Sequence, residues 1–271
     1  MLITLAGVIG VGKSSMTKIL ADLLNTKAVY EPVEENPMLE LFYKDKEKYG
    51  LLFQIDMLSK RFEMIQEAMS VNNGILDRSI FEDSIFLDQL VQEGHVSELE
   101  QQVYHRLLNR MLKELEPLPK KTPDLMIVLN CTFEEEIKRI NARAREFEKV
   151  EEGTELFEYF KRHHENYQKW IGKDLGFPKI VLDVTSYDYV NCKQDRIELV
   201  TQIIYKLHEV KALSTVEAVY TLAKLNGVKW NMKNANKYGL DLYNYCAGNM
   251  PFHELSQFTD NKTLYPLDKK S

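Results

Sequence analysis

Short apolar runs alternate with longer amphipathic segments over most of the chain. The apolar runs have the length of buried strands and cover residues 2–6, 28–30, 74–76, 125–129 and 179–182. The segments between them repeat apolar positions at helical spacing, which predicts helices at 13–24, 50–69, 97–116, 132–145, 155–171 and 195–210. Strands separated by helices are typical of an α/β fold, so we expect a parallel five-stranded sheet flanked by helices.

The pattern changes near Lys211, and we interpret residues 212–271 as a C-terminal extension to a domain of residues 1–211. Ser214-Thr-Val-Glu217 has the spacing of a capping box, which predicts a helix that runs to about Leu225 and ends at Asn226-Gly227. The remainder is rich in Asn, Tyr and Lys and carries no readable chemistry. We expect a helical extension of unassigned role.

Composition restricts the classes of protein that the chain can belong to. Among 271 residues, 44% are hydrophobic and 28% are charged, which is ordinary globular usage and excludes a disordered chain. No apolar run approaches the roughly 20 residues of a membrane span. The net charge of −6 gives no overall field for nucleic acid or anionic lipid, so we expect neither as a partner. The three cysteines lie far apart, which favours a reduced, cytoplasmic location.

The strongest chemical signal is a glycine-rich segment between the first apolar run and the first predicted helix. Gly7-Val-Ile-Gly-Val-Gly12-Lys13-Ser14 fits the spacing of a phosphate-binding loop. Glycines let backbone N–H groups point at a phosphate, and the helix N-terminus adds positive potential. The lysine reaches the terminal phosphates and the serine hydroxyl is a ligand for Mg²⁺. The predicted nucleotide-binding residues are Gly7, Gly10, Val11, Gly12, Lys13, Ser14 and Ser15.

Two acidic residues follow neighbouring apolar runs. Asp77, followed by Arg78-Ser79, ends the run at 74–76, and Glu31 ends the run at 28–30. Ligands of parallel sheets bind at the carboxyl ends of the strands. There one of the two acids can hold Mg²⁺, as Asp77 could, and the other can accept a proton from a substrate hydroxyl, a division that phosphoryl transfer to an alcohol requires. A helix cap at Asp77–Ser79 and a solvated loop acid at Glu31 are the alternatives.

A cluster of arginines ends one predicted helix. Arg139 and Arg143 lie four residues apart and share a helix face, and Arg145 falls where the helix ends. Mobile arginines can neutralise the charge that develops on a transferred phosphoryl group. The alternative is a solvated basic helix face.

Taken together, these motifs resemble the deoxynucleoside kinases, especially the small bacterial deoxyadenosine/deoxyguanosine kinases. The resemblance extends from Met1 to about Val210. It rests on the phosphate loop, Glu31-Pro-Val, Phe53-Gln54 with Arg61, Asp77-Arg-Ser-Ile-Phe-Glu-Asp83, the Arg139–Arg145 lid and Asp183-Val. It implies a P-loop kinase fold, the donor ATP with Mg²⁺, transfer to the 5′-hydroxyl of a deoxynucleoside in nucleotide salvage, and a homodimer.

The resemblance also implies roles for individual residues at the acceptor end. Glu31 looks like the general base for the 5′-hydroxyl, and Arg78 like its positioning partner. Gln54, Arg61 and Asp83 occupy the positions that read the nucleobase.

Further implied roles concern the sugar and the phosphate donor. Tyr43 and Glu148 fall where the family binds the 3′-hydroxyl. The lid arginines would close over the phosphates, and the loop that begins near Asp183 would contact the adenine of ATP.

Two other functions remain to be weighed. A thymidylate-type monophosphate kinase shares the phosphate loop and an Asp-Arg pair, but Glu31 would repel the phosphate of its acceptor. A non-catalytic nucleotide-binding subunit of the same fold would be expected to lose Lys13, Ser14 or the base, and all three are present. The preferred base and the preferred donor are not readable from the sequence.

Overall fold

A five-stranded parallel sheet organises the first of two compact units in the computed structural model, which describes residues 1–33, 36–71, 73–115 and 122–227. The strand order is β2-β3-β1-β4-β5. The strands are β1 (Leu2–Gly7), β2 (Lys27–Val29), β3 (Gly74–Asp77), β4 (Leu125–Asn130) and β5 (Lys179–Asp183). Each predicted apolar run forms one of these strands, and every pairing is parallel, so the predicted sheet is confirmed.

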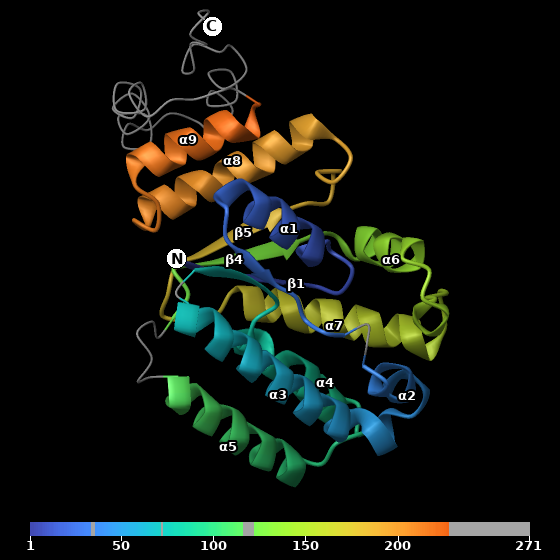
Figure 1. Cartoon of the computed structure of the whole chain (residues 1–271). Helices are drawn as coiled ribbons and strands as arrows, with labels where there is room; N and C mark the ends of the chain where they lie inside the picture. The colour runs from blue at the N-terminus through green and yellow to red at the C-terminus, as the bar shows by residue number, and fades with distance from the viewer. Residues whose placement is uncertain (34–35, 72, 116–121, 228–271) are drawn as a thin grey trace, which may run out of the picture. The chain divides into compact units, whose positions relative to one another are not determined.

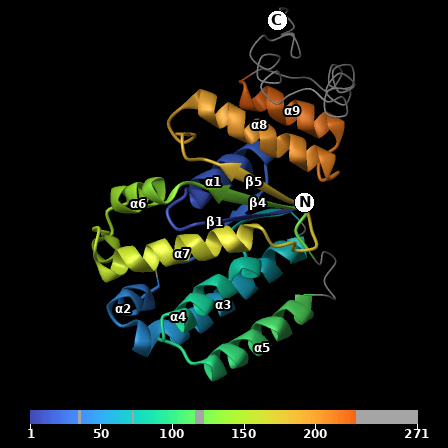
Figure 2. The same cartoon turned by 180° about the vertical axis from the view of Figure 1, so that it is seen from behind.

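The first unit comprises residues 1–18 and 27–185. Figures 1 and 2 show α3 (Lys46–Val71), α4 (Ser84–Gln92) and α7 (Glu155–Ile171) on one side of the sheet, with α5 (Glu98–Leu115) beyond α3 and α4. The core lies where these helices meet the strands. Its fully or nearly fully buried side chains include Leu2, Met57, Leu58, Leu76, Leu87 and Phe160.

Capping explains most of the boundaries that differ from the predicted ones. The helix expected at 50–69 begins earlier, at Lys46, because the Asp45 carboxylate accepts the Lys48 N–H at 2.9 Å and caps it. The helix expected at 132–145 is α6 (Phe133–Ala142), which Thr132 caps. It ends before Arg145, where Ala144 takes a left-handed φ of 58°. Neither the short helix α2 (Met38–Lys44) nor α4 falls within a predicted helical range.

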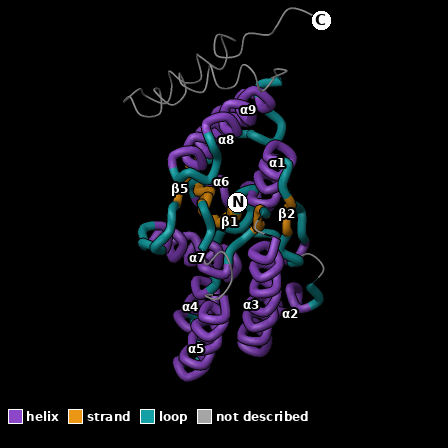
Figure 3. Tube along the Cα trace, turned by 60° about the vertical axis from the view of Figure 1, so that its left-hand side comes forward, coloured by secondary structure: helices purple, strands orange, loops and turns teal. Residues whose placement is uncertain are grey.

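The second unit groups residues 19–26 with 186–271, of which the structure describes those up to 227. The helix α1 (Lys13–Leu24) begins in the first unit and ends in this one. In the second unit α8 (Lys193–Glu209) and α9 (Thr215–Leu225) lie side by side (Figure 3). The predicted capping box of Ser214 and Glu217 is formed. Lys224 donates to the carbonyls of Asp22 and Leu23 at the end of α1.

The rest of the predicted extension, residues 228–271, lies outside the described residues, as does Cys246. Within the part of the chain that the structure describes, no helix combines the length and the apolar character that crossing a membrane requires.

Candidate active site

Three strands of the sheet end side by side at one edge and bring the predicted residues there. β1 lies next to β3 and β3 next to β2, all parallel, so their carboxyl ends share that edge. The phosphate loop follows β1, Glu31 follows β2, and Arg78 follows Asp77 at the end of β3. The strand order therefore gathers residues that are far apart in the sequence.

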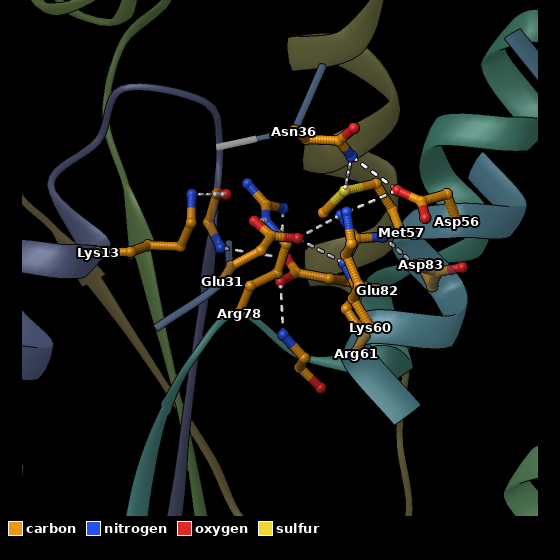
Figure 4. A network of polar contacts seen from close by, with 12 residues as sticks. Lys13, Glu31, Asn36, Asp56, Met57, Lys60, Arg61, Arg78, Glu82 and Asp83 are labelled. Carbon is orange, nitrogen blue, oxygen red and sulfur yellow. Dashed lines mark hydrogen bonds and ion pairs between the residues drawn. The ribbon is translucent and has the colours of Figure 1, made fainter. Parts of the chain in front are cut away.

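The Glu31 carboxylate lies between two arginines (Figure 4). Arg61 of α3 donates its Nε–H to Oε1 at 2.6 Å, and Arg78 donates its Nε–H to Oε2 at 2.9 Å. The Glu31 side chain is 8% exposed. Burial alone would raise the pKa of this carboxyl, but the two guanidinium charges and the Arg61 hydrogen bond outweigh it, so the pKa lies below its ordinary value. The carboxylate is thus ionised at neutral pH.

Asn36, five residues after Glu31, makes a second contact with α3. The amide of Asn36 donates to the Asp56 carboxylate of α3 at 2.8 Å, and Asp56 also pairs with Lys60. The side-chain oxygen Oδ1 of Asn36 accepts the N–H of Met38 at the start of α2. The helix α3 therefore contacts this segment both at Glu31 and at Asn36.

Arg78 adopts an unusual backbone conformation, with a φ of 90°. Left-handed φ values are unfavourable for residues other than glycine and recur at functional sites. Glu82 stabilises this turn, because its carboxylate accepts the Ser79 N–H at 3.0 Å and lies 3.5 Å from Nη1 of Arg78. The buried Nη1 makes no hydrogen bond to any described residue, so it remains available to an oxygen of a ligand.

One aromatic ring lies beneath both arginines of the site. The guanidinium carbons of Arg61 and Arg78 lie 5.2 Å and 4.9 Å from the centre of the Phe86 ring of α4. These distances are typical of cation–π contacts. Phe86 therefore helps to fix the positions of the two guanidinium groups that flank Glu31.

The predicted base-reading residues form a buried ion pair and a buried amide. Arg61 donates through Nη1 to Oδ1 of Asp83, and Tyr104 of α5 donates its hydroxyl to Oδ2 of the same carboxylate. Burial raises the pKa of Asp83, and the Arg61 charge opposes it only in part. Gln54 lies seven residues before Arg61 and so on the same face of α3. Its amide oxygen is buried without a hydrogen-bond partner in the part of the chain described.

The phosphate loop has the conformation that its glycines allow. Gly10 and Gly12 have φ values of 78° and 102°, and a Cβ on Gly7 would lie 2.3 Å from the Leu129 carbonyl oxygen. The Gly7 N–H donates to the Tyr167 hydroxyl of α7 at 2.9 Å. Val11, within the loop, is fully buried.

Lys13 begins α1 and turns back over the phosphate loop. Its Nζ donates to the carbonyls of Gly7 and Val8, each at 2.8 Å. Burial, with the nearby Arg78 charge, lowers the Lys13 pKa to about 8. An anionic phosphate would favour the charged form of this lysine.

The residues near Lys13 fit a hard cation. Asp77 is 5% exposed and its carboxylate is hydrogen-bonded to the hydroxyl of Ser14. Burial raises the pKa of Asp77, and the Lys13 charge and the Ser14 hydrogen bond oppose that rise. Carboxylate and hydroxyl oxygens are the ligands that Mg²⁺ takes beside nucleotide phosphates. Ser15 follows in the first turn of α1.

The three predicted lid arginines divide into two groups. Arg139 donates to the carbonyl oxygens of Val11 in the phosphate loop at 3.0 Å and of Val184 at 2.8 Å. Arg143 and Arg145 both pair with the buried Glu148 carboxylate, the latter at 3.1 Å. The cluster is therefore engaged by acids and carbonyls rather than forming a solvated face.

Tyr43 of α2 joins the Glu148 group. Burial raises the pKa of the Tyr43 hydroxyl well above its ordinary value, and the charge of Glu148, to which it is hydrogen-bonded, adds to this effect. The two predicted 3′-hydroxyl ligands thus lie in contact. Asp183, at the end of β5, accepts the N–H and the hydroxyl of Thr185 and closes a tight turn there.

Several residues that support the site were not predicted. Glu82 holds the Arg78 turn, Tyr167 holds the first glycine of the phosphate loop, and Tyr104 holds Asp83. The apolar spacing of α5 and α7 marks both tyrosines only as core residues. Glu82 lies inside the motif Asp77–Asp83, where its spacing from Ser79 is the signal of a capping box.

Comparison with known proteins identifies relatives along most of the chain. A family model described as deoxynucleoside kinase matches residues 3–209. A deoxyguanosine kinase of Lactobacillus acidophilus is 41% identical over 211 residues, which span 78% of this chain and 92% of that protein. A deoxyadenosine kinase of the same organism is 35% identical over 208 residues, which span 77% and 97%.

The solved structures agree with this result. A deoxyadenosine kinase from M. mycoides, with bound dATP, superimposes with a TM-score of 0.63 and 28% identity, and the match covers 75% of this chain and 99% of that one. The sheet, the phosphate loop and this likeness confirm the predicted P-loop kinase fold.

Proposed function

The chain belongs to the deoxynucleoside kinase family, and from this premise we propose that it transfers the γ-phosphoryl group of ATP to the 5′-hydroxyl of deoxyadenosine or deoxyguanosine, as a step of nucleotide salvage. One observation carries the proposal. A buried, ionised carboxylate, Glu31, is held by two arginines at the sheet edge where the phosphate loop begins. This is where a base for an alcohol must lie if the phosphate of a nucleotide occupies that loop.

Base recognition is assigned to Gln54, Arg61 and Asp83. The Gln54 amide oxygen lacks a partner among the described residues although it is buried, which is the state expected of a group that bonds a ligand. Asp83 and Arg61 offer an acceptor and a donor side by side. A purine base presents donors and acceptors along its edges that these side chains can pair with. The set therefore supports a purine deoxynucleoside as the substrate, in agreement with the names of the two Lactobacillus relatives.

The donor end is assigned to the phosphate loop with Lys13, Ser14 and Asp77. When a nucleotide binds, Lys13 releases the carbonyls of Gly7 and Val8 and donates to phosphate oxygens instead. The backbone N–H groups of the loop donate to the same phosphates. Mg²⁺ held at Ser14 and Asp77 would draw charge from the phosphate oxygens. We assign the adenine contact to the loop that begins at Asp183.

The reaction can be written with the residues in place. Glu31 takes the proton of the 5′-hydroxyl, the oxygen attacks the γ-phosphorus, and the bond from that phosphorus to the β-γ bridging oxygen breaks to release ADP. Arg78 keeps Glu31 oriented and ionised. Arg143 and Arg145 leave Glu148 and neutralise the charge on the phosphoryl group. Arg139 holds the phosphate loop in place through the Val11 carbonyl. Tyr43 and Glu148 bind the 3′-hydroxyl.

Both alternative functions are disfavoured. An acceptor monophosphate would bring negative charge toward Glu31 and Asp83. A non-catalytic subunit would have no need of a base with a lowered pKa beside an intact phosphate loop.

The test is a panel of the four deoxynucleosides, each with ATP and Mg²⁺, and with deoxyadenosine monophosphate as a further acceptor. We expect turnover of deoxyadenosine, deoxyguanosine or both, and none of the monophosphate. Glu31→Gln serves as the control for catalysis by trace contaminants. Turnover of the monophosphate alone, or of no acceptor, would refute the proposal.

We further propose a cytoplasmic homodimer. The described cysteines, Cys131 and Cys192, are free thiols. On α5, Leu99, Val103 and Leu107 are 69%, 50% and 37% exposed, and at a spacing of four residues they form one apolar stripe. Light scattering should give twice the chain mass.

A charge inside the apolar stripe tests whether it is the dimer interface. Val103→Glu should give monomers, because a buried, unpaired carboxylate is costly in an interface. Gln102→Glu adds the same charge to a neighbouring exposed position of α5 and should leave the dimer intact. Equal masses for the two variants would contradict this assignment.

The domain division, residues 1–211 and an extension of 212–271, also stays a proposal. The family model ends at residue 209, which supports it. Two truncations test it, one after Gly227 and one after Lys211. We expect the order of preference among the deoxynucleosides to survive both, and stability to fall only in the second, which removes Leu213, Val219 and Leu222 from their buried positions. A reordered preference in a folded truncation would refute the division.

A further inference from the structure

The hydroxyl of Tyr104 has a contact that core packing does not require. Tyr104 lies on α5, outside every motif in the sequence, and is 1% exposed. Its hydroxyl donates to Oδ2 of Asp83, while Oδ1 accepts from Arg61 of α3. Each oxygen of this buried carboxylate is therefore held by a donor from a different helix.

The neutral donor on Oδ2 leaves Arg61 free for a second carboxylate. Arg61 places Nη1 on Asp83, and Nε and Nη2 on Oε1 of Glu31, both at 2.6 Å. A guanidinium beside a single carboxylate tends to bind both of its oxygens. Without the Tyr104 hydroxyl, Oδ2 of Asp83 would compete with Glu31 for the N–H groups of Arg61. Tyr104 thus favours the divided arrangement and adds no charge to the site.

The rotation of the Asp83 carboxylate determines where its remaining lone pairs point. A carboxylate has about four acceptor positions, and here two of them are occupied by Tyr104 and Arg61. Adenine offers an amino donor beside a ring acceptor, whereas guanine offers a ring N–H donor beside a carbonyl. The angle of the carboxylate therefore decides which of these edges it can pair with.

We propose that Tyr104 is a positioning residue for base specificity, and that its hydroxyl sets the angle of Asp83 and so the purine that the Asp83–Arg61 pair accepts. This inference rests on the proposed function, since it assigns Asp83 to base recognition. It does not require Tyr104 to contact the substrate.

A purely structural role for Tyr104 can be separated from this one within the same helix. The next residue, His105, also bonds a carboxylate, with its Nε2 lying 2.9 Å from Oδ1 of Asp88 on α4, and Gln101 bonds the same oxygen at 2.8 Å. These two contacts dock α5 on α4 without involving Asp83. His105→Phe therefore removes a helix-docking bond and keeps a ring, as Tyr104→Phe removes the Asp83 bond and keeps a ring.

The experiment compares Tyr104→Phe, His105→Phe and the wild type in the same four-deoxynucleoside panel, with kcat and KM measured separately. For Tyr104→Phe we expect kcat/KM of the preferred purine to fall about tenfold, mainly through KM, because one partner of a buried acceptor is lost. The ratio of kcat/KM between the two purines should change by at least about fivefold. For His105→Phe we expect that ratio to stay within about twofold of the wild type.

Calorimetric titration of each deoxynucleoside, without ATP, repeats the comparison as binding constants and keeps it measurable where turnover is low. An unchanged purine ratio in Tyr104→Phe, or an equal change in His105→Phe, overturns the inference and leaves the proposed function standing. A wild type that neither binds nor phosphorylates any deoxynucleoside overturns both.

Discussion

Replacing Arg61 by methionine tests the central ion-pair network of the site. Arg61 is 5% exposed, and its partners Glu31 and Asp83 are 8% and 0% exposed. Methionine keeps an unbranched chain but removes every N–H that Arg61 donates to the two carboxylates. Glu31 then retains its hydrogen bond from Arg78, and among the described side chains Asp83 retains the hydrogen bond from the Tyr104 hydroxyl alone.

The expected loss of stability is large for a single substitution. Removing one partner of a buried ion pair costs about 3–5 kcal/mol, because the other charge stays buried without compensation. For a protein of this size about 1 kcal/mol shifts the melting temperature by roughly 2–4 °C, so the melting temperature should fall by about 10 °C at pH 7.5. Urea unfolding at the same pH gives the free energy directly.

The pH dependence of this loss has a defined sign. In the wild type the pKa of Glu31 lies below its ordinary value, so its contribution to stability is present above the unfolded pKa and is lost as pH falls through the folded pKa. In Arg61→Met, burial without that cation raises the pKa, and protonation at lower pH then favours the folded state. The difference in unfolding free energy between the two proteins should therefore narrow from pH 7.5 to pH 5.

A matched double variant completes the test. Asp83→Asn in the Arg61→Met background removes the buried charge that has lost its ion-pair partner, and should recover part of the lost stability. A loss below about 1 kcal/mol at pH 7.5, the scale of an exposed ion pair, would refute the view that these charges depend on one another for their burial.

Four further outcomes are expected from the structure. Glu31→Gln should lower kcat about 100-fold or more with nearly unchanged ATP affinity, and a change within about threefold in steady-state assays would exclude it as the base. Arg143→Ala should lower kcat more than it raises KM for the deoxynucleoside, whereas an effect on KM alone would assign it to binding. Asp83→Ala should lower kcat/KM for the preferred base about tenfold or more and reduce discrimination in the substrate panel. Burial raises the Cys131 pKa to about 12, so mass spectrometry should find Cys192 alkylated well before Cys131 at pH 8, and equal rates would contradict that burial.

Much of the fold was predictable because its buried strands are continuous in apolar residues. β1 and β4 are buried along almost their whole length, as strands covered on both faces must be, and both matched the apolar runs closely. The strand order was not predictable, because no local pattern records which strands pair. The seven residues of α2 were missed because a helix of that length shows less than two full turns of periodicity.

Some residues of the candidate site could be predicted from the sequence and others could not. The residues adjacent to strand ends, such as Glu31 and Arg78, could be named from the sequence because parallel strands end at one edge. Tyr104 could not, because its position on α5 is one of an apolar series and the contact of its hydroxyl depends on the packing of two distant helices. The pairing of Arg143 and Arg145 with Glu148 likewise depends on the turn after α6. The left-handed residue of that turn is Ala144 and not a glycine, so the sequence gives no signal of the turn.

The ring beneath Arg61 and Arg78 has a consequence for protein engineering. Phe86 contacts the guanidinium of Arg61, which pairs with the proposed base-reading acid Asp83, and the guanidinium of Arg78, which holds the proposed general base Glu31. A substitution there shifts both at once, so a library that varies Phe86 to obtain new substrates will also lose rate in most of its members. Variation at Gln54, which has no contact with either cation among the described hydrogen bonds and ion pairs, separates the two properties and is the better starting point for enzymes that activate modified nucleosides.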